Sequence, residues 1–343
     1  MAIEIIATGR SVPARRVTND ELAKTMETSD EWIRSHTGIG SRHIADDDTA
    51  TSDLALIAAQ RALEMLMEKD PSLGSIEAAA LTLDIIVVAT ASPDFNGFPS
   101  VACIVQDKIG AKNAGALDVA AGCTGFAYAL DTAAGILTMG KKRKRALVIG
   151  AEILTRITNW EDRGTSVLFG DGAGSVILEK TDAPSEGKGK RGFMRSILGA
   201  DGSGGEYLIL RRGGTRNPFK KGEIVEKTPH IEMNGRAVYN FAVKAVTDTI
   251  EQLLADEGIT VNELARIIPH QANERIVQAA AKRLGIPLEK FYLNIEEYAN
   301  TSAASIPIAL DELVRSGGLK KGDYFMTVGF GAGLTYAGNL FIW

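Results

Sequence analysis

One cysteine of this 343-residue chain, Cys123, stands where a thiol can act as a nucleophile. It lies between an apolar run that ends at Val119 and a small-residue run, residues 126–137, that predicts a helix. At a helix N-terminus, unpaired N–H groups and the helix dipole favour the thiolate, the attacking form in acyl transfer. Free cysteine is also among the most buried residue types, so a purely structural role stays open. The other cysteine, Cys103, lies in an apolar helical pattern, and we expect it to be a packed core residue.

A cysteine that transfers acyl groups needs a neutral imidazole or an amide nearby, because these groups donate hydrogen bonds to developing oxyanions. His270 is the best candidate, since it directly follows the apolar run 266–269, at a strand end where α/β folds place functional side chains. The other three histidines, His36, His43 and His230, lie in polar or loop segments. A structural role for His270 stays open.

Asn300 precedes a predicted helix that starts at Thr301, much as Cys123 precedes its own helix. We therefore expect Asn300 to occupy the position that corresponds to Cys123 and to supply an amide. Asparagine is also a good helix N-cap, and the two roles are compatible. The glycine-rich segment 329–333 could form an oxyanion hole with the backbone N–H of Cys123, or it could be only a turn.

The elements that must position these residues alternate between short β-branched runs and helical stretches. This alternation is typical of an α/β fold whose strands are covered on both faces by helices. The predicted strands are 84–89, 114–119, 145–150, 266–269, 291–295 and 324–328.

The order of these elements repeats. In each half, a strand, a loop and a helix are followed by a second strand, a small-residue helix and a glycine-rich hairpin, at 169–174 and at 329–333. The repeat predicts a duplicated unit, with an N-terminal half 1–180 and a C-terminal half 181–343. The boundary is expected in the polar stretch 180–191, where no periodic apolar pattern remains.

Composition narrows the class of protein. Hydrophobic residues make up 45% and the formal net charge is -5, so we expect a globular protein that does not bind nucleic acid. Two cysteines are too few for a disulfide framework, which favours a reducing compartment. The N-terminus lacks the pattern of a signal peptide and no apolar stretch reaches the ~18 residues of a membrane span, so we expect a cytoplasmic protein.

Several separated motifs, in order along nearly the whole chain, resemble β-ketoacyl-acyl carrier protein synthase III. They are the segments 122–126, 269–273, 300–307 and 329–333, with 30–33, 37–39, 162–165 and 169–174 in support. The resemblance implies a thiolase-like fold, in which two pseudo-symmetric duplicated α/β halves form a layered α-β-α-β-α arrangement. It also implies an enzyme that condenses an acyl-CoA starter with malonyl-acyl carrier protein, initiating fatty acid synthesis.

The resemblance assigns a role to each candidate. Cys123 attacks the acyl-CoA thioester and holds the acyl group, and His270 and Asn300 donate hydrogen bonds to the malonyl thioester oxygen during decarboxylation. The N–H groups of Cys123 and Ala332 form the oxyanion hole. No metal or redox cofactor is implied, because decarboxylation itself supplies the carbanion.

Further residues match binding positions of the family. Trp32 and Arg163 match residues that sandwich the CoA adenine, Arg236 lies at a CoA-binding position, and Phe98 matches a residue that crosses a homodimer interface into the partner's acyl pocket. Residues at carrier-protein docking positions are Gln271, Ala272, Asn273, Arg275, Lys282 and Arg283.

The chain also departs from the family pattern. His36 and Arg236 replace an arginine and an asparagine in the CoA site, and Asn240 replaces a basic docking residue. The segments 73–75 and 211–221 are longer than expected, which leaves the choice of starter open.

Four other classes of protein share some of these features. A thiolase would use a second cysteine after Cys123, and an elongating synthase would use a second histidine in place of Asn300; the chain has neither. An acyltransferase that makes an ester or amide keeps the same fold and cysteine, and stays an alternative. A non-catalytic homologue that only binds carrier protein is disfavoured, because the thiol and the imidazole are both present.

Overall fold

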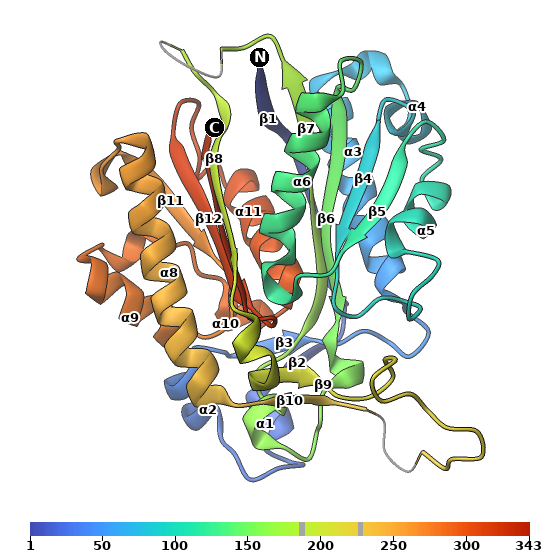
Figure 1. The fold of residues 1–343 in the computed structure, drawn as a ribbon, viewed down its shortest axis with the longest axis vertical. Coiled ribbons are helices and arrows are strands. Elements are labelled where there is room, and N and C mark those ends of the chain that lie inside the picture. Colours follow the sequence, from blue (N-terminus) through green and yellow to red (C-terminus); the bar gives the residue numbers. More distant parts are fainter. Residues whose placement is uncertain (185–188, 226–228) are drawn as a thin grey trace.

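The computed structural model describes residues 1–184, 189–225 and 229–343, which form two main β-sheets (Figure 1). The first sheet has the strand order β1-β7-β6-β4-β5, and the second has the order β11-β12-β13-β8. The strands of the first sheet are β1 (Ala2–Ser11), β4 (Ile85–Ala89), β5 (Gly115–Val119), β6 (Arg145–Ile153) and β7 (Asp171–Thr181). Those of the second are β8 (Gly192–Ala200), β11 (Leu264–Pro269), β12 (Tyr324–Gly331) and β13 (Thr335–Ile342).

The central strands are apolar because both of their faces are covered. All five residues of β4, Ile-Ile-Val-Val-Ala, are buried. β4 pairs in parallel with β5 and β6, and β11 pairs in parallel with β12, whereas the remaining pairings in the two sheets are antiparallel. The parallel strands bring their carboxyl ends to one edge of each sheet, where α/β folds carry functional loops.

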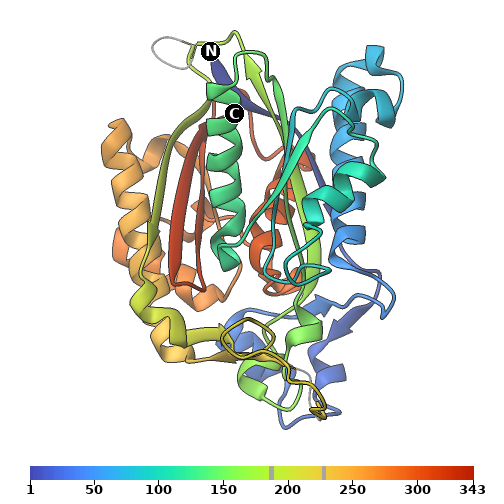
Figure 2. The same ribbon diagram turned by 45° about the vertical axis from the view of Figure 1, so that its right-hand side comes forward.

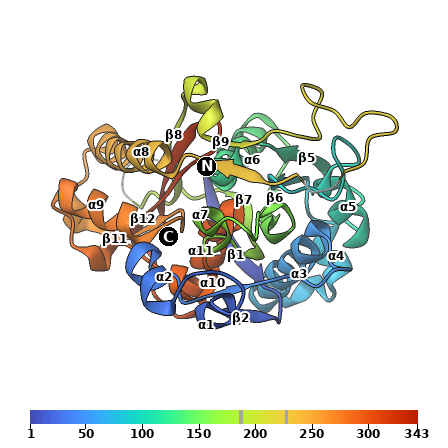
Figure 3. The same cartoon turned by 90° about the horizontal axis from the view of Figure 1, so that it is seen from below.

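Helices form three layers around the two sheets. The helices α6 (Gly125–Met139) and α11 (Ser305–Arg315) lie between the sheets (Figures 1 and 2). Seen from below, α8 (Gly235–Glu257) and α9 (Glu274–Leu284) lie on one side, and α3 (Thr51–Lys69), α4 (Ile76–Ala80) and α5 (Val101–Lys108) on the other (Figure 3). The layers therefore follow the predicted α-β-α-β-α order.

The composition of α6 suits its place in the middle layer. Its alanines at 127, 129, 133 and 134 are buried, so the helix can pack closely against a sheet on each side. No helix in the described part of the chain is long and apolar enough to cross a membrane.

Small elements gather at one end of the molecule, at the bottom of Figure 1. They are the helices α1 (Asn19–Leu22), α2 (Asp30–Thr37), α7 (Arg163–Ser166) and α10 (Ile295–Tyr298), and the paired strands β2 (Arg16–Thr18) with β3 (Ser41–His43) and β9 (Leu208–Leu210) with β10 (Ile231–Met233).

Two sequence predictions of secondary structure are wrong. Residues 291–295 form no strand: Phe291 makes only an isolated bridge to Ile267, and Ile295 already begins α10. Residues 169–174 are not a hairpin, because β7 starts at Asp171 and returns to β6 after the intervening helix α7. Segment 329–333 does lead into the hairpin between β12 and β13.

The division into halves 1–180 and 181–343 remains a proposal. Every strand of the first sheet ends by Thr181, and every strand of the second begins at or after Gly192. Within the expected boundary, residues 185–188 lie outside the described part of the chain.

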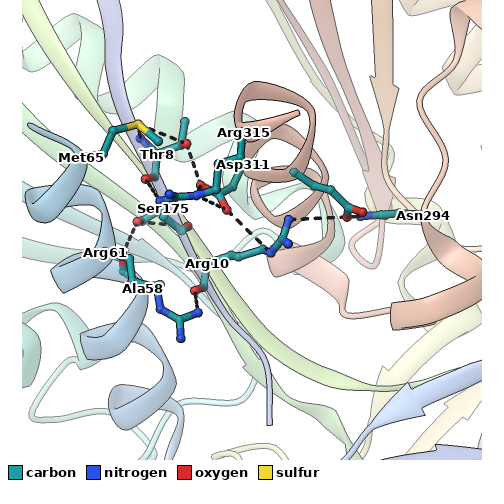
Figure 4. Close-up of polar contacts among 11 residues, drawn as sticks. Thr8, Arg10, Ala58, Arg61, Met65, Ser175, Asn294, Asp311 and Arg315 are labelled. Atoms are coloured by element: carbon teal, nitrogen blue, oxygen red, sulfur yellow. Dashed lines mark hydrogen bonds and ion pairs between the residues drawn. The ribbon is translucent and has the colours of Figure 1, made fainter. Parts of the chain in front are cut away.

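A buried carboxylate links β1 to α11 (Figure 4). Asp311, only 1% exposed, accepts a 2.7 Å hydrogen bond from the Thr8 hydroxyl and a 2.9 Å bond from Arg315 Nε. Arg10 Nε lies 3.7 Å from the same carboxylate. The N-terminal strand is thereby fixed to a helix that lies about 300 residues further along the chain.

Candidate active site

Cys123, His270 and Asn300 line a single cavity of about 230 Å³. Each lies on a different segment of the chain. Cys123 lies in the 3-10 helix η2 (Gly122–Thr124), and His270 follows the end of β11. Asn300 lies in the loop before the 3-10 helix η7 (Ser302–Ala304). The three residues that sequence reasoning selected separately are thus brought together by both sheets. Among the residues described here, no group of three or more His, Cys, Asp or Glu side chains is arranged to hold a metal ion.

Cys123 lies at the entry to α6, as predicted, and its thiol is buried. Burial raises the pKa of the Cys123 thiol to about 11, and hydrogen bonding to Ser302 and to the backbone N–H groups of Ala332 and Cys123 offsets only part of this effect. This direction is opposite to the one expected from a helix N-terminus, because desolvation is the largest influence on the thiol. Gly331 covers the residue so closely that an added Cβ would lie 2.7 Å from the Cβ of Cys123.

Two backbone N–H groups lie next to the sulfur of Cys123. The N–H groups of Cys123 and Ala332 both point at the thiol, one from η2 and the other from the turn after β12. An oxyanion formed on a carbon bonded to this sulfur would lie close to the same two donors. Cys123 and Ala332 also line a second, apolar pocket of about 110 Å³.

His270 is a neutral imidazole. It is 1% exposed, and burial lowers its pKa to about 3. Its Nδ1 atom lies 2.7 Å from the hydroxyl oxygen of Ser305, which accepts a hydrogen bond from the Gln271 backbone N–H. Because the Gln271 N–H already donates to this oxygen, we assign the Ser305 hydroxyl hydrogen to Nδ1 and the ring proton to Nε2.

Asn300 is fixed by hydrogen bonds on both sides. Its N–H donates to the Leu168 carbonyl at 2.9 Å, and its carbonyl accepts from the Gly170 N–H at 3.1 Å, in a bridge to Phe169 of the first half. Its side-chain Oδ1 accepts from the Ser302 N–H at 2.9 Å. The Nδ2 amide of Asn300 is then left as the donor for a bound molecule.

The predicted correspondence between Asn300 and Cys123 is wrong by three positions. The 3-10 helices η2 and η7 each precede a central helix, and aligning them places Gly122 opposite Ser302 and Cys123 opposite Ala303. The backbone supports this alignment, because φ is +51° at Gly122 and +47° at Ser302.

The mouth of the cavity is lined by Trp32, His36 and Arg163. The guanidinium carbon of Arg163 lies 4.5 Å from the Trp32 ring centroid, and the His36 ring stacks on Trp32 at 4.4 Å. A planar aromatic group could bind among these planar side chains. The cavity therefore connects an aromatic and cationic surface site to the buried thiol.

Gln271, Arg236 and Phe98 were selected from the sequence but do not line this cavity. Gln271 is buried and bonds to the carbonyls of Pro269 and Tyr292, so its assignment to carrier-protein docking is wrong. Arg236 is exposed and does not line the cavity, and Phe98 is 88% exposed on a loop of its own.

The remaining docking candidates lie on or just before α9. Ala272 and Asn273 line the cavity, and Asn273 caps α9 by accepting from the Arg275 N–H at 2.9 Å. Arg275, Lys282 and Arg283 are exposed, and their side chains have no ion pair among the described residues. The other cysteine, Cys103, is exposed on α5, which contradicts the expectation of a core residue.

Two residues behind the thiol were not identified from the sequence. Glu152 lies on β6 and is fully buried, and its negative charge raises the pKa of the Cys123 thiol. Ser302 lines the apolar pocket beside Cys123. Glu152 is the single charged residue within the apolar run 146–154, a pattern that predicts a buried charge with specific partners.

Family models match two segments of this chain: residues 117–202 match "3-Oxoacyl-[acyl-carrier-protein (ACP)] synthase III", and residues 254–343 match the C-terminal model of the same family. A "Beta-ketoacyl-[acyl-carrier-protein] synthase III" of Caldanaerobacter subterraneus subsp. tengcongensis is 47% identical over 100% of this chain and 98% of its own. The crystal structure of a 3-oxoacyl-[acyl-carrier-protein] synthase III from Aquifex aeolicus VF5 is 39% identical with a TM-score of 0.86, covering 100% of both chains. A priming β-ketosynthase from the R1128 polyketide pathway is 33% identical with a TM-score of 0.86, covering 99% of this chain and 96% of its own.

Proposed function

The chain belongs to the 3-oxoacyl-[acyl-carrier-protein] synthase III family, and from this membership we propose that it catalyses the initiating condensation of fatty acid synthesis. The reaction joins an acyl group from acyl-CoA to malonyl-acyl carrier protein, with loss of CO₂, and gives a β-ketoacyl-acyl carrier protein. One observation supports the residue assignments: Cys123, the neutral His270 and Asn300 line the same cavity.

In the first half-reaction, Cys123 attacks the acyl-CoA thioester. The sulfur–carbon bond forms, the oxyanion accepts hydrogen bonds from the N–H groups of Cys123 and Ala332, and CoA leaves as its thiol. The acyl chain then occupies the apolar pocket of about 110 Å³ beside Cys123. The small volume of this pocket favours short starters.

In the second half-reaction, malonyl-acyl carrier protein enters the emptied cavity. His270 donates from Nε2 and Asn300 from Nδ2 to the malonyl thioester oxygen, so the electron pair released with CO₂ is held as an enolate. The enolate carbon attacks the acyl-Cys123 carbonyl, and Cys123 is the leaving group. The neutral state of His270 matters because decarboxylation needs a hydrogen-bond donor and no net proton transfer to the ring.

We assign the CoA adenine to the site between Trp32 and Arg163, where stacking and a cationic plane are both available. The acidic carrier protein would dock on the exposed cations Arg275, Lys282 and Arg283 of α9. Arg236 lies on the first turn of α8 beside cavity-lining Gly235, and it could reach the CoA phosphates only from outside the cavity.

We also propose a homodimer in the cytoplasm, made of chains with halves 1–180 and 181–343. An aromatic side chain that is 88% exposed, Phe98, is better buried against a second copy. Both cysteines are free, which suits a reducing compartment. No cofactor beyond the acyl-CoA substrate is needed for this chemistry.

The test is intact-protein mass after incubation with a panel of acyl-CoAs, followed by malonyl-acyl carrier protein. Wild type should gain one acyl mass and pass it into a β-ketoacyl product, whereas Cys123→Ala should gain none. Cys103→Ala is the matched control and should behave as wild type, because Cys103 lies on the outer surface of α5. Acylation without condensation would favour an ester- or amide-forming acyltransferase instead.

A further inference from the structure

Arg42 is a fully buried cation next to a wall of the cavity. It lies on β3 and is 0% exposed, and within the described ranges 1–184, 189–225 and 229–343 no carboxylate forms an ion pair with it. Burial lowers the pKa of Arg42 to about 10, so the guanidinium is still protonated at neutral pH. Burying a charge without a carboxylate partner is costly. The groups that accept its hydrogen bonds therefore indicate what the cation is needed for.

The first group that Arg42 holds is the end of α7. Its Nη2 donates a 2.8 Å hydrogen bond to the carbonyl of Val167, the residue that caps the C-terminus of this helix and also lines the cavity. The helix is only four residues long and begins with Arg163. So short a helix is not stable by itself, and an arginine that binds its last carbonyl stabilises that end. Arg42 thereby fixes the segment that carries Arg163.

The second group is α2, which Arg42 reaches through Asn19. Arg42 Nη1 donates to Asn19 Oδ1 at 2.8 Å, and Asn19 Nδ2 donates to Asp30 Oδ1 at 2.8 Å and to the Ile39 carbonyl at 2.7 Å. Asn19 is 0% exposed, so water does not compete for these bonds. The hydrogen bond from Asn19 is the largest cause that lowers the pKa of Asp30. Asp30 is the first residue of α2, and Trp32 lies on the same turn.

Surface side chains also join these helices to their surroundings, but less firmly. Arg163 is exposed, and its Nη1 donates at 2.9 Å to the carbonyl of Glu27, in the loop before α2. Asp30 also forms an ion pair with Arg34, but both side chains are about 40% exposed, and exposed pairs contribute little to stability. Arg42 is fully buried, so its connection to both helices is shielded from water where it starts.

We propose that Arg42 is a positioning residue for the CoA adenine: it fixes α2 and α7 relative to each other, and thereby Trp32 relative to Arg163. This inference rests on the proposed function, which places the adenine between these two side chains. Arg42 does not line the cavity itself, so it acts only through the helices that it joins. A guanidinium suits this task because one rigid plane offers separate N–H groups to Asn19 and to the Val167 carbonyl.

Two variants break the connection at different points. In Arg42→Lys the charge is kept, but all N–H groups are on one nitrogen, so the bonds to Asn19 and to Val167 cannot both be kept at their present lengths. Asn19→Asp keeps the acceptor for Arg42 and replaces the Nδ2 donor with a carboxylate oxygen that faces Asp30. The second variant therefore releases α2 alone, and it tests the proposal even if Arg42→Lys does not fold.

The test separates the adenine site from the rest of the cavity. Binding of adenosine 3′,5′-bisphosphate, a nucleotide fragment of CoA, is measured by calorimetry, and Kd should rise about tenfold in both variants, the equivalent of one hydrogen bond. Acyl loading is then followed with acyl-CoA and with the acyl-pantetheine thioester, which lacks the nucleotide. KM for acyl-CoA should rise about tenfold with kcat little changed, whereas KM for the pantetheine thioester should equal that of wild type. A general structural defect would raise both KM values and overturn the proposal.

Arg156→Met is the matched control. Arg156 Nη2 also donates to backbone carbonyls, three of them within residues 46–49, but Arg156 does not line the cavity, and its loss should leave nucleotide binding unchanged. Wild-type nucleotide affinity in Arg42→Lys and Asn19→Asp, with wild-type circular dichroism, would overturn this proposal alone, as would an equal loss in Arg156→Met. A wild type that does not bind the nucleotide would overturn the adenine site itself, and this proposal with it.

Discussion

The Nδ1 atom of His270 lies 2.7 Å from the hydroxyl oxygen of Ser305, and this contact decides which ring nitrogen carries the proton. In Ser305→Ala, Nδ1 loses its donor and the proton can move there, which leaves Nε2 unable to donate to the malonyl oxygen. We expect condensation to fall about tenfold, the equivalent of one hydrogen bond, while acyl loading of Cys123 is unchanged. Single-turnover assays of each half-reaction measure this separation.

The control for this prediction is Ser305→Cys, whose weaker S–H donor should recover part of the condensation rate. An equal loss of loading and condensation in Ser305→Ala would argue against a role in setting the tautomer. Thermal unfolding of both variants is needed as well, because the Gln271 N–H loses its acceptor in the alanine variant.

Asn300→Asp should block decarboxylation. The Oδ1 atom already accepts the Ser302 N–H, so the amide nitrogen is the group that faces the cavity. Aspartate replaces this donor with an anion where negative charge develops, and CO₂ release from malonyl-acyl carrier protein should fall by about 10²–10³. Asn300→Ala removes the donor without adding charge and should be less impaired. Equal activity of the aspartate variant and wild type would remove Asn300 from the decarboxylation step.

Trp32→Ala should weaken acyl-CoA binding and leave the carrier-protein substrate unaffected. The loss of one stacking platform costs about 1–3 kcal/mol, so KM for acyl-CoA should rise about tenfold, with kcat and KM for malonyl-acyl carrier protein little changed. Trp160→Ala is the matched control, because Trp160 does not line this cavity. A parallel rise in both KM values would indicate a general disturbance of the cavity.

Stability should depend on pH through His270. Its pKa is about 3 in the folded protein and about 6.5 when unfolded, so between these values the unfolded chain binds a proton that the folded chain does not. Stability is therefore fully present above about pH 6.5 and falls by about 1.4 kcal/mol per pH unit on acidification. Urea unfolding of wild type and His270→Gln at pH 7.0 and 5.5 isolates this contribution, since both proteins share the other histidines. Identical pH slopes would mean that His270 is protonated in the folded state.

Asp311→Ala should destabilise the protein without altering catalysis. Removal of this buried carboxylate leaves Arg315 and the Thr8 hydroxyl without their partner, at a cost of about 3 kcal/mol in the free energy of unfolding. Glu312→Ala provides the comparison, because Glu312 pairs with Arg10 at 3.6 Å from a partly exposed position, and its loss should cost at most about 1 kcal/mol. Similar losses in the two variants, or a changed KM, would contradict this assignment.

The strands that the sequence predicted well are those buried on both faces. β4 and β6 are continuous apolar runs, and their length and turn signals are visible locally. β8 was missed because its exposure alternates irregularly along its length. The false strand at 291–295 has strand-like composition, but Ile295 starts the short helix α10, which ends two residues before Asn300.

Site residues could be predicted from the sequence where the residues next to them form a recognisable pattern. Cys123 and His270 each follow an apolar strand, and the sequence places both at strand ends. Glu152 meets the segment around Ser302, 150 positions further along the chain, only in the folded protein, so the sequence next to either residue does not indicate its role. Burial of the thiol, which raises its pKa where the helix N-terminus was expected to lower it, is likewise a property of the assembled sheets.

The close cover that Gly331 provides for Cys123 has a consequence for biosynthesis. Cys123 leaves the ribosome about two hundred residues before the strand that shields it, so the growing chain carries a bare thiol next to an unfinished second sheet. Oxidants and electrophiles that cannot enter the mature cavity can reach it during that interval. The thiol of the newly made chain is then modified more easily than the thiol of the finished enzyme. Thiol reagents applied during refolding should inactivate far more protein than the same dose applied afterwards.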